Sequence, residues 1–478
     1  MEKNDVKCEQ LMNIFREDMS VLLMLQNYLL NFIDNSKILQ FYEMVIETKI
    51  HQNNNMFSEF LSLLSFICAV RPKESQSYIQ LLIHFIPLIK ENFSQKEIYQ
   101  LFSPCKQFII LLYEHGCINL NDILGSREFQ DHDSFIFFPE IQENDEKYFL
   151  ELKKYVWFNQ LHIYYTNKMT ISEFKEKRLL GLSEFEIVKI ISEDKIDDFI
   201  DFVSSKNLDV FSKPATSVFE YDPLIKGMKP DLIEYAAYFG SIHIFKYLLM
   251  QYEVAERLLD KNIFYFAVSG GSTEIIHLIE SKEKINYSLY VKYAIKTFQI
   301  DLVNYLFNQN PENLRRDIYY CIEFFNLEAL LLFLAVLNEM HFTISYIEMA
   351  AMCGYVDLLS FFIKISDFDI NSEINDGVSK NNIYRTLLHI AVNSEKYNVV
   401  AFLLTLEGID INIKNYIYFL ICMMFISGLY YVFTINYETP LDIAMQLKNT
   451  KIIEILQKKE ESIHKKSTKN SNGNFLME

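Results

Sequence analysis

Glycine and proline are scarce in this sequence, which contains only 12 glycines and 9 prolines among 478 residues. Few backbone positions can therefore adopt the special dihedral angles that tight turns and phosphate-binding loops require. This scarcity favours helices and disfavours β-sandwiches and glycine-rich nucleotide sites. The nucleotide-binding and hydrolase patterns G-x-x-x-x-G-K-[ST], G-x-G-x-x-G and G-x-S-x-G do not occur.

Metal-binding patterns are missing as well. The seven cysteines form no C-x-x-C, and none of the ten histidines forms H-E-x-x-H or pairs with a cysteine at zinc spacing. The cysteines are scattered, odd in number and mostly inside apolar runs, which is typical of small core residues in a reducing compartment. We therefore expect no metal and no cofactor.

Basic residues are fewer than acidic ones: the sequence has 45 basic and 63 acidic residues, and its formal net charge is −18. A chain of this charge repels polyphosphate, so the sequence predicts no nucleic-acid partner. The same charge favours a basic or neutral protein partner. The first ten residues are polar and do not resemble a secretory signal.

A helix–turn–helix pattern recurs along the second half of the chain. In residues 231–249, Ala236 permits close helix packing, Gly240 can end the first helix, and an apolar pair follows eight and nine residues after Ala236. The same spacing follows the anchors Ile191, Ala236, Ala267, Ala294, Cys321, Ala350, Ala391 and Ala444. One such hairpin cannot bury its own apolar stripe, so the copies are expected to stack.

Two of these copies resemble the ankyrin-repeat signature T-P-L-H-x-A: TLLHIA at 386–391 and TPLDIA at 439–444. GIDIN at 408–412 resembles the β-turn finger that follows the second helix of such a repeat. The anchor spacing scatters around about 33 residues, the ankyrin period. The resemblance implies an all-α fold, an ankyrin-type α-solenoid of about eight helix-turn-helix repeats, preceded by a helical N-terminal region. Degenerate repeats behind such a region resemble the ankyrin-repeat family expanded in some protists.

The resemblance also implies structural roles for particular residues. In ankyrin repeats the signature histidine, here His389, ties adjacent turns together through hydrogen bonds. The structural repeat positions inferred from the sequence are Ala236, Gly240, Ala267, Gly271, Ala294, Ala350, Gly354, Thr386, His389, Ala391, Thr439, Pro440 and Ala444. No catalytic, cofactor-binding or metal-binding residue is predicted.

Three regions are expected along the chain. Residues 1–185 carry apolar residues at spacings of three and four and form the helical N-terminal region. Residues 186–457 form the repeat array. Residues 458–478 are polar and mixed in charge, and are expected to be a disordered tail.

An uncharged apolar segment, residues 416–435, interrupts the last repeats. Its twenty residues are long enough for a transmembrane helix. However, a membrane span here would separate the final repeat from the neighbours on which it must pack. Three interpretations remain open: an insertion foreign to the fold, a buried or surface-lying hydrophobic hairpin or helix, and a membrane anchor.

The sequence predicts a non-enzymatic protein-interaction scaffold or adaptor in the cytoplasm. Its partner-facing positions are the polar residues before each anchor and the finger tips. The alternative is a membrane-anchored ankyrin-repeat protein that uses residues 416–435. No sequence motif supports a third hypothesis, an enzyme with its active site in the N-terminal region.

Overall fold

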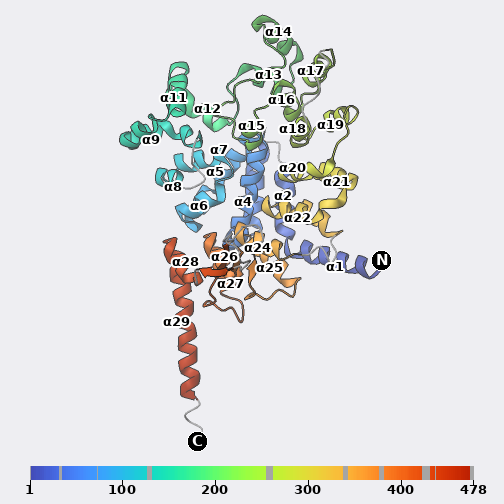
Figure 1. Cartoon of the computed structure of the whole chain (residues 1–478). Coiled ribbons are helices and arrows are strands. Elements are labelled where there is room, and N and C mark those ends of the chain that lie inside the picture. Colours follow the sequence, from blue (N-terminus) through green and yellow to red (C-terminus); the bar gives the residue numbers. More distant parts are fainter. Residues whose placement is uncertain are drawn as a thin grey trace, which may run out of the picture. The chain divides into compact units, whose positions relative to one another are not determined.

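The computed structural model describes residues 2–31, 35–72, 74–125, 132–254, 262–336, 343–375, 382–421, 431–435 and 438–473. They divide into two compact units, residues 21–332 and residues 1–20 with 333–478. Helix pairs of one pattern recur in both, so the fold is the predicted helical repeat array with a helical N-terminal region (Figure 1).

The first part of unit 21–332 consists of packed helices without the repeat pattern. Its α-helices are α2 (Ser20–Leu30), α3 (Ile38–Glu47), α4 (Asn54–Val70), α5 (Ser75–Asn92), α6 (Gln95–Phe102), α7 (Lys106–Glu114), α8 (Leu120–Leu124), α9 (Phe138–Asn144), α10 (Glu146–Leu152), α11 (Val156–Lys168) and α12 (Ile171–Leu180). Helix α4 lies at the centre of these helices, because it has buried residues on most of its sides. A buried ion pair also holds this region together: Arg178 donates two hydrogen bonds to Glu140, at 2.7 and 2.8 Å.

The second part of this unit contains five consecutive helix pairs. They are α13 (Glu186–Ser192) with α14 (Ile196–Lys206), α16 (Leu232–Phe239) with α17 (Ile242–Val254), α18 (Ile263–Gly270) with α19 (Thr273–Glu280), α20 (Val291–Lys296) with α21 (Ile300–Gln309), and α22 (Leu314–Glu323) with α23 (Leu327–Leu334). Helix α15 (Pro223–Met228) lies in the long first connection. The first helices contact one another in chain order, from α13 to α22, so each pair buries its apolar stripe against the next.

The other unit contains α1 (Glu2–Asp18) and three further pairs. These are α24 (Ile344–Cys353) with α25 (Val356–Lys364), α26 (Leu387–Asn393) with α27 (Tyr397–Leu403), and α28 (Pro440–Gln446) with α29 (Thr450–Gly473). Helix α1 packs on α25, where the rings of Phe15 and Phe361 meet edge to face at 5.0 Å. Lys364 also pairs with Asp18 at 3.1 Å.

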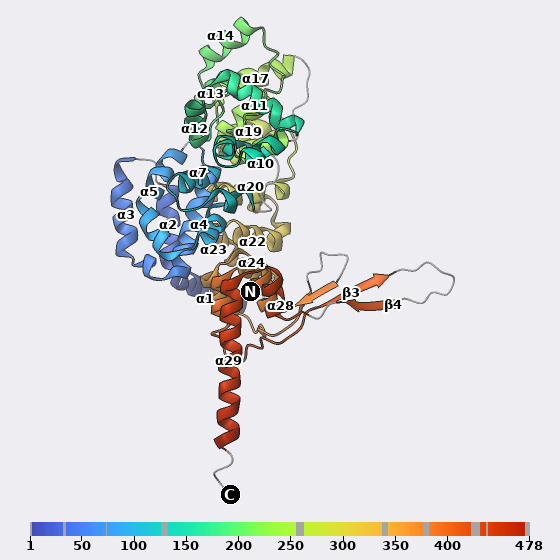
Figure 2. The ribbon, with the colours of Figure 1, turned by 90° about the vertical axis from the view of Figure 1, so that its left-hand side faces the viewer.

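This unit also contains a small antiparallel sheet, and its last two strands match the hydrophobic hairpin that was one of the interpretations left open for residues 416–435. It has the order β1 (Ile374–Asn375), β2 (Asn382–Arg385), β3 (Tyr416–Ile421), β4 (Tyr431–Ile435). Strands β3 and β4 pair from Ile417 with Ile435 to Ile421 with Tyr431, and form a hairpin beside α28 (Figure 2). The apolar segment 416–435 therefore contains two strands, as its aromatic and β-branched residues favour. No helix in the described part of the chain is both long and apolar enough to cross a membrane.

The predicted disordered tail is largely helical. Residues 458–473 continue α29 as far as Gly473 (Figure 1). The segment is rich in lysine and glutamate, which are good helix formers. Glu461 and Lys465 also form an i,i+4 ion pair at 3.7 Å, a spacing that supports a helix.

The division of the chain differs from the boundary expected at residue 185, because the N-terminal helices and the first five pairs form one compact unit. Gln26 on α2 is fully buried and joins the two parts. Its side-chain amide donates to Asn326 Oδ1 at 3.2 Å and accepts from the Leu327 N–H at 2.9 Å. A single polar contact across 300 residues leaves no trace in the hydrophobic periodicity.

Candidate functional site

The anchor residues lie in the first helix of each pair. Ala236, Ala267, Ala294, Ala350, Ala391 and Ala444 have no exposed surface, and Cys321 is 1% exposed. Seven of the eight anchors are followed, four residues later, by a residue with a positive φ: Gly240, Gly271, Phe298, Phe325, Gly354, Glu395 and Lys448. The left-handed turn is thus part of the repeat even where no glycine marks it.

Backbone hydrogen bonds close these turns. The Ser241 N–H donates to the Ala236 carbonyl at 2.9 Å, which is the closing bond of a Schellman motif. In the first pair the left-handed residue is Asp194, and the Lys195 N–H donates to the carbonyl of Ile190 at 3.3 Å. The anchor expected at Ile191 is therefore displaced by one residue.

The segment with the ankyrin-like signature forms a connected hydrogen-bond chain. Thr386 caps α26, and both its N–H (3.2 Å) and its hydroxyl (2.8 Å) contact His389 Nδ1. Because Nδ1 accepts the backbone N–H, the proton lies on Nε2, which donates to the Glu438 carbonyl at 3.0 Å. His389 is fully buried, and burial lowers its pKa. The neutral imidazole thus joins the start of α26 to the residue before Thr439, the N-cap of α28.

The second signature segment forms a capping box. The Thr439 N–H donates to Asp442 Oδ2 at 2.8 Å, and the Asp442 N–H donates to Thr439 Oγ1 at 3.2 Å. Pro440 occupies the first helical position, where its missing N–H has no cost.

Two finger segments pair with each other. The side chain of Asn371 donates to the Gly408 carbonyl at 2.7 Å and accepts from the Asp410 N–H at 2.9 Å. The sequence Asp-Ile-Asn occurs both at 369–371 and at 410–412, and in each copy the aspartate side chain accepts the N–H of the asparagine. The earlier finger could have been found from this repeated tripeptide.

Tyrosines line the first helices of the middle repeats: Tyr265, Tyr293 and Tyr320 are half-buried, and Tyr290, directly before α20, is 6% exposed. We define the tyrosine face as Tyr265, Tyr290, Tyr293, Tyr320 and Lys292. The ring of Tyr265 lies 4.6 Å from Tyr290 and 4.7 Å from Tyr293, between centroids. Lys292 Nζ lies 4.8 Å from the centroid of Tyr293 and 6.0 Å from that of Tyr320. The face therefore extends over α18, α20 and α22.

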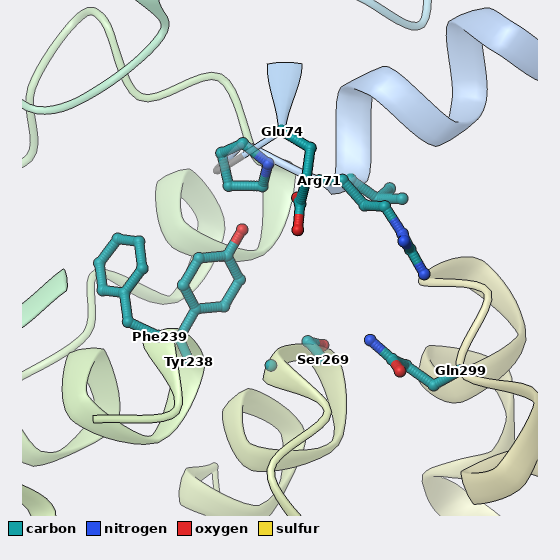
Figure 3. Close-up of a pocket in the computed structure, with 9 residues that line it drawn as sticks. Arg71, Glu74, Tyr238, Phe239, Ser269 and Gln299 are labelled. Carbon is teal, nitrogen blue, oxygen red and sulfur yellow. The ribbon is translucent and has the colours of Figure 1, made fainter. Parts of the chain in front are cut away.

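A cavity of about 160 Å³ lies where the connection between α4 and α5 meets the repeats. Arg71 and Glu74 line it from the N-terminal helices, and Tyr238, Ser269 and Gln299 line it from three successive repeats (Figure 3). Arg71 Nη1 donates to the Leu30 carbonyl at 2.8 Å, whereas its buried Nε has no partner among the described residues.

Chemically, this cavity is polar and carries groups of both charges. The Tyr238 hydroxyl is already engaged, because it donates to Asp222 at 2.7 Å. A space of this size and composition can hold ordered water or one polar side chain.

Buried acids are the most perturbed titratable groups of the array. Burial raises the pKa of Glu220 to about 7, although its carboxylate accepts hydrogen bonds from the Ser217 N–H at 3.0 Å and the Tyr235 hydroxyl at 3.1 Å. Burial also raises the pKa of Asp317 to about 7. Asp317 is 1% exposed, and its Oδ1 has no partner among the described residues.

Comparison with known families agrees with this geometry. The family model of the ankyrin repeat matches residues 384–416, which contain α26, α27 and the finger at 408–412. The chain contains an ankyrin repeat. A second family model, a domain of unknown function (DUF3447), matches residues 257–333. That range contains α18 to α22 and the whole tyrosine face.

Among solved structures, this chain is similar to the ankyrin repeat domain of human ASB11. The two are 12% identical with a TM-score of 0.23, and the match covers 58% of this chain and 98% of that one. This likeness is too distant to carry an argument. No curated protein matches the sequence.

Two further predictions concern the cysteines and metal binding. Cys68, Cys105, Cys117, Cys321 and Cys353 form no disulfide. No group of three or more potential metal ligands occurs in the part of the chain that was described. The tyrosine face and Arg71 were not singled out from the sequence. The tyrosines at one or two residues before the anchors could have indicated the face, because three successive repeats carry one there.

Proposed function

We propose that this protein is a non-enzymatic interaction scaffold that binds a protein partner through its ankyrin repeats. The single observation that supports this most strongly is the tyrosine face. Three of its four tyrosine rings, Tyr265, Tyr293 and Tyr320, are half-buried on first helices, near the polar positions before each anchor that the sequence predicts to face a partner. Tyrosine supplies a large, rigid contact area at low entropic cost, and it is enriched at binding hot spots.

The remaining parts of the proposal concern how the array is held and where the protein works. We propose that the buried anchors and left-handed turns keep the repeats in register, while His389 and the paired fingers join the last ones. That the described cysteines form no disulfide is in keeping with a reducing cytoplasm. A membrane anchor through residues 416–435 is not favoured, because the described parts of that segment are two paired strands.

The test is site-specific photo-crosslinking of the full chain in cells. A photoreactive phenylalanine analogue replaces Tyr293 or Tyr320 in the tyrosine face, and the control replaces Glu274 on α19, a second helix. We expect the two face positions to capture the same protein and the control position not to capture it. Equal capture from all three positions would refute the proposed surface.

The same partner must then lose affinity when the face is truncated. Tyr293→Ala should weaken its binding at least tenfold, since hot-spot truncations cost about 2 kcal/mol or more. The melting temperature of the variant has to stay close to that of the parent chain. Unchanged affinity would place the binding energy elsewhere.

A further inference from the structure

The helix α11 in the N-terminal region exposes an apolar face. Among the large apolar side chains exposed in the described residues, five lie between residues 150 and 164. They are Leu150 (55% exposed), Tyr155 (59%), Val156 (70%), Ile163 (50%) and Tyr164 (42%). Single exposed apolar residues are ordinary, whereas a cluster rimmed by polar residues marks an interaction site.

The spacing places most of this cluster on one side of the helix. Val156, Ile163 and Tyr164 follow one another at i, i+7 and i+8, with Gln160 at i+4 and Asn167 at i+11 between and beyond them. All five positions are exposed apart from the engaged hydroxyl of Tyr164. We call this stripe the outer face of α11.

The opposite side of α11 is fixed in the core. Phe158 meets Phe135 edge to face at 5.2 Å, and Tyr165 lies 5.8 Å from the same ring. His162 packs against Phe138 at 5.4 Å. The outer face is therefore held on a rigid element, so little ordering entropy is lost when a partner docks.

Lysines bracket the outer face at both ends. Lys153 and Lys154 precede α11, and Lys168 ends it, where its Nζ donates to the Tyr164 hydroxyl at 2.9 Å and lies 5.1 Å from the ring centroid. Residues 146–168 contain four lysines and two glutamates, a local charge of +2 in a chain of −18. The lysines at the two ends of α11 are thus a local concentration of positive charge in an acidic chain.

We propose that the outer face of α11 binds an acidic amphipathic helix of a partner protein. The partner helix packs its apolar stripe on Val156, Ile163 and Tyr164 and places carboxylates against the lysines at the two ends. These ends are about 20 Å apart at 1.5 Å per residue, so the partner needs about four turns. This surface is separate from the tyrosine face.

A protein fits this face better than a lipid surface does. Gln160 and Asn167 lie within the stripe, and each would lose its hydrogen bonds in hydrocarbon. A partner helix can supply hydrogen-bonding side chains at those positions.

The test is a selection from a display library of sixteen-residue helical peptides, with apolar residues at i, i+3, i+4 and i+7 and all other positions randomised. The full chain is the target, and the variant Val156→Ser/Ile163→Ser is the counter-target. We expect enriched peptides that are acidic at both ends. Binding should shift the emission of Trp157, the single tryptophan, to the blue, because it neighbours Val156.

Two sets of variants check the assignment with the enriched peptide. Ile163→Ser should weaken binding at least tenfold, whereas Met250→Ser, a matched apolar residue that is 55% exposed on α17, should not change it. Lys154→Glu/Lys168→Glu should reverse the preference toward a peptide whose acids are replaced by lysine. Melting temperatures establish that each variant is folded.

Three outcomes would overturn the proposal. The first is failure of any peptide to be enriched over the counter-target. The second is enrichment of neutral or basic peptides, or an affinity that is indifferent to Ile163→Ser. The third is an equal shift of the Trp157 emission with phosphatidylcholine–phosphatidylserine vesicles alone, which would assign the face to a membrane.

Discussion

Gly270 ends α18 directly against the backbone of α16. A Cβ atom at this position would lie 2.2 Å from the carbonyl oxygen of Tyr238 and 2.7 Å from that of Ala237. Both are backbone atoms, so no change of rotamer relieves the overlap, and the two helices must move apart. Overpacking costs about 1–3 kcal/mol and occasionally more. Because both close atoms belong to the backbone, the cost should lie at or above the upper end of that range, about 3 kcal/mol. Alanine regains about 1 kcal/mol over glycine inside a helix, which leaves a net destabilisation of about 2 kcal/mol or more for Gly270→Ala.

Two other glycines of the same unit serve as matched controls. Gly227 in α15 has nothing within 4 Å of an added Cβ, so Gly227→Ala should be neutral or slightly stabilising. Gly240 has a φ of +69° and its nearest atom is the Ser272 Cβ at 3.6 Å. Gly240→Ala should therefore destabilise the unit only by the cost of placing an alanine in the left-handed conformation, roughly 1–2 kcal/mol.

The assay is urea unfolding followed by the fluorescence of Trp157, which lies in the same compact unit as the three glycines. The expected order of midpoints is Gly227→Ala highest, then Gly240→Ala, then Gly270→Ala. If Gly270→Ala unfolded at the same urea concentration as Gly227→Ala, the close contact of α16 with α18 would be incorrect, and with it the stacking of the first helices.

Three further predictions concern buried polar groups and the apolar segment. Because burial raises the pKa of Asp317 from 3.8 to about 7, the folded chain holds a proton there that the unfolded chain releases, so stability should fall from about pH 4 to pH 7. Asp317→Asn should remove the share of Asp317 from that fall in urea unfolding, whereas the share of Glu220, whose pKa is also raised to about 7, should remain. The pKa of His389 is lowered instead, so its share of the stability is lost as the pH drops below about 6.5, and His389→Ala should flatten circular-dichroism melts between pH 5 and 7. Asn415 and Glu438 already exchange two hydrogen bonds of 2.9 Å, so replacing residues 416–437 by Asn-Gly should leave the helical signal and melting temperature nearly unchanged.

The helical repeat class could be predicted from the sequence because the anchors recur with their apolar pairs. Local patterns of this kind depend on which residues share a helix face, and stacking demands the same face in every copy. The first copy was displaced because Ile190 and Ile191 are both isoleucine and the turn residue is Asp194, so neither hydrophobicity nor a glycine distinguishes the two registers. Four later turns also lack a glycine at the left-handed position, which is occupied by Phe298, Phe325, Glu395 and Lys448.

A hairpin within 416–435 was one of the interpretations left open, but length and hydrophobicity could not favour it over a membrane helix, because both measures are satisfied equally by a membrane helix and by two apolar strands. What distinguishes the two is the position of the ends. Asn415 and Glu438 are bonded to each other, so the segment must leave and return at one place. A hairpin meets this requirement, whereas a single spanning helix would separate its ends by about 30 Å.

The docking of the N-terminal helices on the array has a consequence for binding. At the turn end of the first helices, Gln26 bonds to Asn326 and the ring of Phe66 lies 6.5 Å from that of Phe324, between centroids. The cavity around Arg71 lies along the same end. The turn end of the first helices is therefore occupied by the chain itself. Exposing the buried Gln26 amide would break both its bonds to the repeats, at about 1 kcal/mol each, together with the ring contact. A partner gains more by using the tyrosine face, which needs no such displacement, and this is why the proposed binding residues precede the anchors.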